Sequence, residues 1–407
     1  MFETMKQYNN ETISVLILSL FSSMIPLSEP TFKGNEWNYI KECLDTGWVS
    51  SVGKFVSEFE NKVAAYTGAR YAIATVNGTA ALHVSLVALG IQPHDEIIVP
   101  TLTFIAPVNA VTYCNALPLF FDANKDTLCI DVASVQKFLE TETTQKNTGY
   151  IYNKKTGNRI FGIIPVHIAG HPADMEEILY LSQKYNLTVV EDAAESIGSL
   201  YTNKHTGTFG KLGCLSFNGN KIITTGGGGM VLTDDEGLAK MVRHLTTQAK
   251  KDGLEYIHDA VGYNYRLTNI QAALGVAQME QLEGFVEKKR KNFERYQSLL
   301  QEIDNISLMQ ECTGVKSNKW LYTLRVPKED KNPLIHYLIS KDIQVRPVWT
   351  PVHTFDMYKN HAAYEIKNAF DIHDTCIHIP SSVDLTHVEI DTVTQEIKKY
   401  FHYEKKR

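Results

Sequence analysis

The sequence lacks the features of several large protein classes. Its 407 residues carry 40 Lys and Arg against 46 Asp and Glu, a formal net charge of −6, and no stretch is dense in cations. Because binding to a phosphate backbone needs clustered cations, we expect no nucleic acid partner. The composition, 43% hydrophobic and 21% charged, is that of a globular protein and excludes disordered and fibrous classes.

Paired cysteines and long hydrophobic runs are also absent. No CxxC pair occurs among Cys43, Cys114, Cys129, Cys214, Cys312 and Cys376, so we expect core or free thiols in a reducing cytoplasm. The most apolar stretch, residues 13–21, has nine residues, whereas a membrane-spanning helix needs about 20. We predict no membrane span, and residues 1–25 are expected to form a helical extension packed on the body or on a partner subunit.

Short apolar runs alternate with helical segments along most of the chain. Expected strands are residues 71–76, 96–100, 119–121, 161–166, 187–190 and 215–217, with expected helices at 80–89 and 173–185. This alternation predicts an α/β fold with a mainly parallel central sheet sandwiched by helices. A long charged helix over 271–290, continuing toward residue 300, is expected to leave this domain. We place a large domain at 26–285 and a smaller α+β domain at 286–407.

Ligands of parallel sheets bind beyond the carboxyl ends of the strands, so polar residues at those positions are candidate site residues. Asn77-Gly78-Thr79-Ala80 lies between an expected strand and an expected helix, where glycine and the first helical amides can bind a phosphate. An ordinary glycine turn with a threonine N-cap is the alternative. The motif is neither a P-loop nor a GxGxxG fingerprint, which disfavours nucleotide hydrolysis and hydride transfer.

A lysine and an aspartate follow two further expected strands. Lys221 lies between an apolar strand and residues 222–223, ahead of the glycine run 226–229. A lysine held among apolar residues has a depressed pKa and can form a Schiff base. The glycines let the backbone pass close to a ligand, although a flexible surface turn is the alternative for them. Asp192 could keep a proton on a pyridine nitrogen, and Phe104 could offer an aromatic face to the ring. This combination is what pyridoxal phosphate chemistry requires.

His167, His171 and Asp174 superficially resemble a metal cluster. Gly170 and Pro172 break any helix between them, so the two imidazoles need not share a face. We predict a turn near the active site and no metal.

Six motifs together resemble the DegT-type nucleotide-sugar aminotransferases. They are Gly47-Trp48-Val49-Ser50, the segment 77–82, Pro100-x-x-Thr103-Phe104, the segment 191–196, the segment 216–221 with its glycines, and the segment 262–266. They follow one another in family-like order from about Pro26 to the C-terminus. The resemblance implies the aspartate-aminotransferase fold (fold type I), pyridoxal 5'-phosphate as cofactor, glutamate as amino donor, and a homodimer with shared active sites.

The resemblance also implies a role for individual residues. Lys221 would bind the cofactor covalently and move the substrate proton. Asp192 would pair with the pyridine nitrogen, Phe104 would stack on the ring, and Glu195 would meet the cofactor hydroxyl. The phosphate would be held by Gly78, Thr79, Ala80 and Ser216, with Asn264 reaching across from the other subunit. Trp48, His167 and His353 are expected near the sugar.

Two departures from the usual family pattern bear on the substrate. Glu195 stands where many members have Gln or His, and Gly227 stands where Glu is common. These departures and the segment 48–55 are similar to the subgroup from legionaminic-acid and bacillosamine-type pathways. The expected reaction is amination at C4 of a nucleotide-linked 2-acetamido-4-keto-2,6-dideoxy hexose, with UDP as the expected nucleotide, for surface glycan or nonulosonic acid synthesis. The alternatives are another keto sugar, GDP-4-keto-6-deoxymannose or a dTDP-3-keto hexose, and a non-catalytic cofactor-binding regulatory protein.

Overall fold

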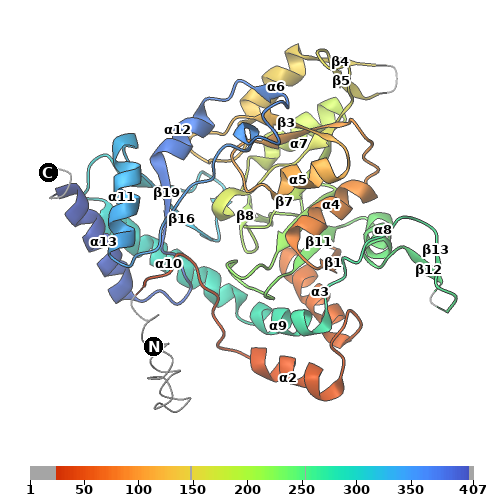
Figure 1. The fold of residues 1–407 in the computed structure, drawn as a ribbon, viewed down its shortest axis with the longest axis horizontal. Coiled ribbons are helices and arrows are strands. Elements are labelled where there is room, and N and C mark those ends of the chain that lie inside the picture. The colour runs from red at the N-terminus through yellow and green to blue at the C-terminus, as the bar shows by residue number, and fades with distance from the viewer. Residues whose placement is uncertain (1–23, 147–148, 253, 403–407) are drawn as a thin grey trace, which may run out of the picture.

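A computed structural model describes residues 24–146, 149–252 and 254–402 (Figure 1). Its centre is an eight-stranded sheet. The strand order is β1 (Tyr71–Thr75), β11 (Gly229–Thr233), β10 (Leu212–Ser216), β7 (Thr188–Asp192), β6 (Ile160–Ile163), β2 (Glu96–Pro100), β3 (Leu117–Phe121) and β18 (Ala363–Tyr364). Only β11 runs antiparallel to its neighbours, and every other pair in this sheet is parallel. The predicted α/β fold with a mainly parallel sheet is confirmed.

Both faces of this sheet are buried under helices, as its continuous apolar strands require. Alternate residues of β2 show this, because Ile98 packs in one core while Ile97 and Val99 pack in the other. The first core is completed by α3 (Lys54–Thr67), α6 (Val132–Thr141), α7 (Met175–Tyr185) and α9 (Asn269–Met279). The second is completed by α4 (Gly78–Ala88), α5 (Ala106–Tyr113) and α8 (Glu236–Thr246).

A third core lies in the C-terminal part of the chain, at the side of Figure 1 where α10, α11 and α13 gather. Its antiparallel sheet has the order β14 (Ser307–Leu308), β16 (Tyr322–Arg325), β19 (Cys376–Ile379), β17 (Arg346–Pro347). The helices α10 (Leu282–Leu300), α11 (Lys328–Ser340) and α13 (His387–His402) pack on it. Ile25 also belongs to this core, and its amide donates to the carbonyl of Asp342 at 2.8 Å.

The remaining elements are short or peripheral. They are α2 (Glu36–Thr46), β4 (Thr143–Gln145), β5 (Ile151–Asn153), η2 (Ile168–Gly170), β8 (Leu200–Tyr201), β9 (Lys204–His205), β12 (Lys250–Asp252), β13 (Ile257–His258), β15 (Val315–Lys316), η3 (Val352–Thr354) and α12 (Asn368–Thr375).

The structure corrects one expected helix and complicates the predicted domain division. The helix expected over 271–290 is two helices, α9 and α10, with a break at residues 280–281. The side chains of Gln278, in the last turn of α9, and Gln281, within the break, both donate to Glu36 of α2. Downstream of residue 285, β18 returns to the large sheet beside β3, and Val352 joins the second core. The boundary at residue 285 therefore stays a prediction.

Across the residues that are described, no helix is both long and apolar enough to cross a bilayer. The expected N-terminal helical extension, with the apolar stretch 13–21, lies outside those residues apart from Met24 and Ile25.

Candidate active site

The carboxyl ends of five strands meet at one edge of the large sheet. Since β1 and β10 are both antiparallel to β11, β1 runs in the same direction as β10, β7, β6 and β2. The segments that follow these strands carry most of the predicted site residues. The sheet topology therefore gathers them at the position where ligands of such sheets bind.

Lys221 lies in a turn after β10 and is buried, with 12% of its side chain exposed. Its Nζ is 3.7 Å from Oε1 of Glu195 and 3.8 Å from the ring centroid of Trp320. Burial lowers the pKa of Lys221, and the nearby carboxylates of Glu195 and Asp192 oppose that shift. A lysine of this kind can be a neutral nucleophile and can also accept and return a proton.

The two carboxyl groups beside this lysine titrate above their usual range. Burial raises the pKa of Glu195 to about 7, although Lys221 and the backbone amide of Ala169 favour its charged form. That amide donates to Oε2 of Glu195 at 2.7 Å. Burial also raises the pKa of Asp192, whose Oδ1 accepts from the amide of Ala194 at 3.1 Å. An amine with a lowered pKa thus lies between acids with raised ones, a pattern typical of sites that move protons near neutral pH.

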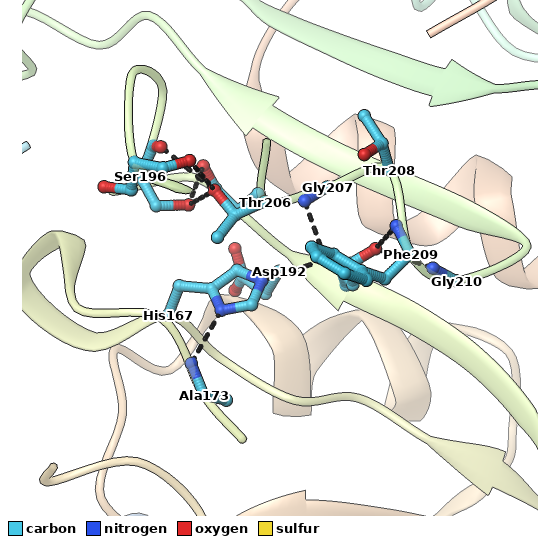
Figure 2. A network of polar contacts seen from close by, with 12 residues as sticks. His167, Ala173, Asp192, Ser196, Thr206, Gly207, Thr208, Phe209 and Gly210 are labelled. Atoms are coloured by element: carbon cyan, nitrogen blue, oxygen red, sulfur yellow. Dashed lines mark hydrogen bonds and ion pairs between the residues drawn. The ribbon is translucent and has the colours of Figure 1, made fainter. Parts of the chain in front are cut away.

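A separate buried carboxylate, Glu191, holds the strand end in place. Its oxygens accept from the backbone amides of Gly207, Phe209 and Gly210 at 2.7, 2.6 and 2.7 Å, and Figure 2 labels these three donors. The ring of His167 meets it at 3.0 Å through Nε2. Burial alone would raise the pKa of Glu191, but these hydrogen bonds hold it below its ordinary value.

His167 has no exposed surface, and both of its ring nitrogens are occupied. Its Nδ1 accepts from the amide of Ala173 at 3.0 Å (Figure 2), so Nε2 carries the proton that is donated to Glu191. No nitrogen is left for a substrate. The geometry therefore does not support the prediction that His167 binds the sugar, and it indicates instead that His167 positions the end of β7.

The segment expected to bind the phosphate lies at the start of α4. Asn77, not a threonine, is the N-cap, and its side chain accepts from the amide of Ala80 at 2.7 Å. This leaves the amides of Gly78 and Thr79, the first two of the helix, without an intrahelical acceptor. A Cβ on Gly78 would lie 3.0 Å from Cβ of Ser216, so glycine allows these two segments to approach. Gly78, Thr79 and Ser216 remain candidates for the phosphate, whereas the amide of Ala80 is already bonded.

The other predicted site residues lie on segments outside the cluster of Lys221, Asp192 and Glu195. Phe104 follows β2 and is 56% exposed, and Thr101 of the same segment contacts His353 with Oγ1 2.6 Å from Nδ1. Trp48, in the connection between α2 and α3, is 57% exposed, and Asn264 is exposed as well. In the described part of this single chain, no contact joins Trp48 or Asn264 to the lysine cluster.

Several groups of the site are available to bind pyridoxal phosphate. Oγ1 of Thr103 is buried just after β2 and finds no hydrogen-bond partner within the described residues. The free amides of α4 suit an anion, the exposed face of Phe104 suits a planar ring, and the buried Asp192 suits a protonated ring nitrogen. Among the residues described, no group of three or more His, Cys, Asp or Glu side chains could hold a metal ion.

Sequence reasoning missed the contributions of the C-terminal segment that precedes β16. Trp320 lies on the amine of Lys221, and the side chain of Asn318 donates to the carbonyl of Glu195 at 2.9 Å. Their sequence separation from these partners is about 100 residues or more, and no local motif marks them. Glu191 was within a quoted motif, but its structural role depends on the loop 207–210.

Comparisons with known proteins agree with this site. Residues 30–398 match the model of the DegT/DnrJ/EryC1/StrS aminotransferase family. A GDP-perosamine synthase of Escherichia coli O157:H7 is 38% identical over 379 residues, 93% of this chain and 98% of that relative. A Bacillus subtilis relative with pyridoxal phosphate-dependent aminotransferase in its name is 35% identical over 383 residues, 93% of this chain and 96% of that protein.

Solved structures show the same fold. The crystal structure of a DegT DnrJ EryC1 StrS aminotransferase from Brucella abortus superimposes with a TM-score of 0.83 at 26% identity, covering 90% of this chain and 95% of that one. The family match, the whole-length relatives and the buried lysine with its carboxylates lead to one conclusion. The chain belongs to the DegT/DnrJ/EryC1/StrS aminotransferase family and is a pyridoxal phosphate-dependent sugar aminotransferase.

Proposed function

We propose that this enzyme transfers an amino group from glutamate to C4 of a nucleotide-linked 4-keto-6-deoxy hexose, with GDP as the nucleotide. The observation that carries the reaction type is the cluster of Lys221, Asp192 and Glu195 at the carboxyl edge of the sheet. The sugar and the nucleotide rest on the relatives. Two of them, from Escherichia coli and Caulobacter vibrioides, are named GDP-perosamine synthase, and each is 38% identical over more than nine-tenths of this chain.

The sequence pattern favoured a UDP-linked 2-acetamido sugar, and that preference rests on a few local motifs. The whole-length relatives support the guanine nucleotide instead, which was an alternative at the sequence level. Both sugars present a ketone at C4, so the same amine-transfer chemistry serves either. We propose the product as a 4-amino sugar for a bacterial surface glycan.

Each member of the cluster has a proposed task. When bound, pyridoxal phosphate supplies the electron sink for the carbon that loses a proton. Lys221 accepts that proton and returns it, because its lowered pKa allows the neutral amine to exist near neutral pH. Asp192 keeps the ring nitrogen protonated, and Glu195 faces the amine of Lys221 with a carboxyl that can change its charge near pH 7. Gly78, Thr79 and Ser216 bind the phosphate.

We propose that two copies complete each site, with Asn264 of one copy reaching the cofactor of the other and Trp48 lying near the sugar. Exposed apolar side chains support this arrangement, since Trp48, Val52, Tyr256 and Val261 are 57, 66, 68 and 83% exposed. A mixture of Lys221→Ala and Asn264→Ala proteins, refolded together, should recover about a quarter of wild-type activity if sites are shared, because half of the dimers carry one intact site. Sites built within one chain would give no recovery.

The substrate is tested with purified enzyme, pyridoxal phosphate and glutamate. GDP-4-keto-6-deoxymannose and UDP-2-acetamido-4-keto-2,6-dideoxyglucose are supplied separately, and 2-oxoglutarate and the amino sugar are quantified. We expect turnover of the GDP sugar, a strong preference over the UDP sugar, and none with Lys221→Ala. Preference for the UDP sugar would overturn the nucleotide assignment. Absence of the visible absorbance of bound cofactor in the wild type would overturn the aminotransferase assignment.

A further inference from the structure

The amine of Lys221 rests on an aromatic face from a distant part of the chain. Nζ lies 3.8 Å from the ring centroid of Trp320, about as close as its 3.7 Å approach to Oε1 of Glu195. An ammonium over the face of an indole is attracted by the negative electrostatic potential of the ring. Trp320 itself is 3% exposed, so the contact is largely shielded from water.

One hydrogen bond from the indole and two from the backbone hold Trp320 in this position. Its Nε1 donates at 2.8 Å to the carbonyl of Asn220, the residue that precedes the lysine. Its backbone amide donates to Oδ1 of Asn318 at 2.9 Å, and its carbonyl accepts from the hydroxyl of Ser381 at 3.2 Å. The ring of Trp349 lies nearly parallel to the indole, with 6.5 Å between the ring centroids. A side chain bound this firmly places its ring and the turn at Asn220 together.

The same short segment also supports the other neighbour of the amine. Asn318 is fully buried, and its Nδ2 donates at 2.9 Å to the carbonyls of both Glu195 and Ile197. Residues 318–320 therefore hold the backbone of Glu195 and the side chain of Lys221 at once.

We propose that Trp320 is a positioning residue for the reactive amine, holding the free Nζ of Lys221 as an ammonium on its indole face and fixing the turn that carries it. The proposal rests on the proposed function, in which Lys221 alternates between a cofactor-bonded and a free amine. The contact favours the free, protonated amine, because an amine bonded to the cofactor cannot present the same ammonium to the ring. Trp320 thereby assists the stage at which the lysine has released the cofactor and holds a proton to return.

The charged groups that face the amine set the size of the effect. Glu195 and Asp192 favour its charged form, burial disfavours it, and the indole adds to the favourable side. Weakening the ring should therefore make Lys221 lose its proton at lower pH. Since a shielded contact of this kind shifts a protonation equilibrium by about three- to tenfold, the midpoint should fall by about 0.5 to 1 pH unit.

The test uses the full-length enzyme loaded with pyridoxamine phosphate, in which Lys221 is not bonded to the cofactor. Competitive labelling with an acylating reagent over a pH series, followed by mass spectrometry of the peptide, gives the titration midpoint of that one amine. Protein grown on 5,7-difluorotryptophan carries weakened rings of nearly unchanged shape at all four tryptophans. We expect its midpoint to fall, and we expect the fluorinated label to have no effect in a Trp320→Phe background.

Two further variants separate the ring from its hydrogen bond. Trp320→Phe keeps an aromatic face and loses the Nε1 contact, so its midpoint should stay closer to the wild type than that of Trp320→Leu. Trp37→Phe, at a tryptophan of α2 that is 76% exposed, is the control and should leave the midpoint unchanged. An unchanged or raised midpoint in fluorinated wild type, or an equal shift in fluorinated Trp320→Phe, would overturn the proposal. Turnover by Lys221→Ala in the sugar assay would instead overturn the proposed function, so the two failures are distinguishable.

Discussion

Two neighbouring carboxylates on β7 should respond in opposite ways to loss of their charge. The carboxylate of Glu191 accepts from three backbone amides and from His167, whereas among the described residues the carboxyl of Asp192 accepts only from the amide of Ala194. Removing one partner of a buried charged network costs about 3–5 kcal/mol. An unfolding entropy of about 2.1 cal/mol/K per residue gives roughly 0.85 kcal/mol/K for 407 residues. Glu191→Gln should therefore lower Tm by about 4–6 °C.

Asp192→Asn should behave differently in the same thermal unfolding assay without cofactor. Asparagine keeps the acceptor that Ala194 uses, and it removes a carboxyl whose pKa burial raises, so Tm should be unchanged or higher. Cofactor affinity should fall in this variant. Glu58→Gln is the control, since Glu58 is 43% exposed, and it should melt within about 1 °C of the wild type. A Glu191→Gln protein as stable as the wild type, or an equally destabilised Asp192→Asn, would refute this reasoning.

The direction of the pKa shift of Glu191 determines how its contribution to stability changes in acid. Its pKa is held below the ordinary value of 4.5, so its stabilising contribution is complete above that pH and is lost as pH falls through the lowered pKa. The Tm difference between wild type and Glu191→Gln should be constant from neutral pH down to about 5 and should shrink in stronger acid.

Three further outcomes are expected. Glu195→Gln should stabilise the cofactor-free protein by about 3 kcal/mol at pH 8 and leave its stability unchanged at pH 4. The reason is that folding raises the pKa of this carboxyl from 4.5 to about 7, so the carboxyl lowers the stability of the fold only at a pH where it ionises. Urea unfolding at both pH values measures the difference. Phe104→Leu should weaken cofactor binding in a fluorescence titration without lowering Tm, because the ring is 56% exposed; a large fall in Tm would contradict this. Gly170→Ala should lower Tm by several degrees, because φ at Gly170 is +86° and the new Cβ would lie 1.8 Å from Oδ1 of Asn318. Gly284→Ala is the control, since a Cβ at Gly284 would have no atom within 4 Å.

The sequence predicted those parts of the fold that depend on local patterns, such as apolar runs and helical periodicity. The strand 96–100 was located at its observed bounds, because Ile97, Ile98 and Val99 form a continuous apolar run in a strand that is buried throughout. The helix at 271–290 was wrong in its continuity, because helical periodicity persists across residues 280–281 while the break coincides with contacts to Glu36, about 240 residues earlier. The threonine N-cap of the alternative reading was wrong for a similar reason, since Asn77 and Thr79 are both good caps and only the backbone conformation selects between them.

The residues of the site also differ in whether local sequence patterns predict them. Lys221, Asp192 and Glu195 follow strand ends, so the parallel topology alone brings them together, and their identities could be read in order along the chain. Trp320 packs in the first core but comes from the segment before β16, and its partner Asn220 is 100 residues away, so neither periodicity nor a motif marks it. Whether such a residue acts on the lysine depends on which face of the indole meets the amine. That orientation is set by tertiary structure. The fluorinated ring tests it directly, because it weakens the negative electrostatic potential of that face and keeps the shape of the ring.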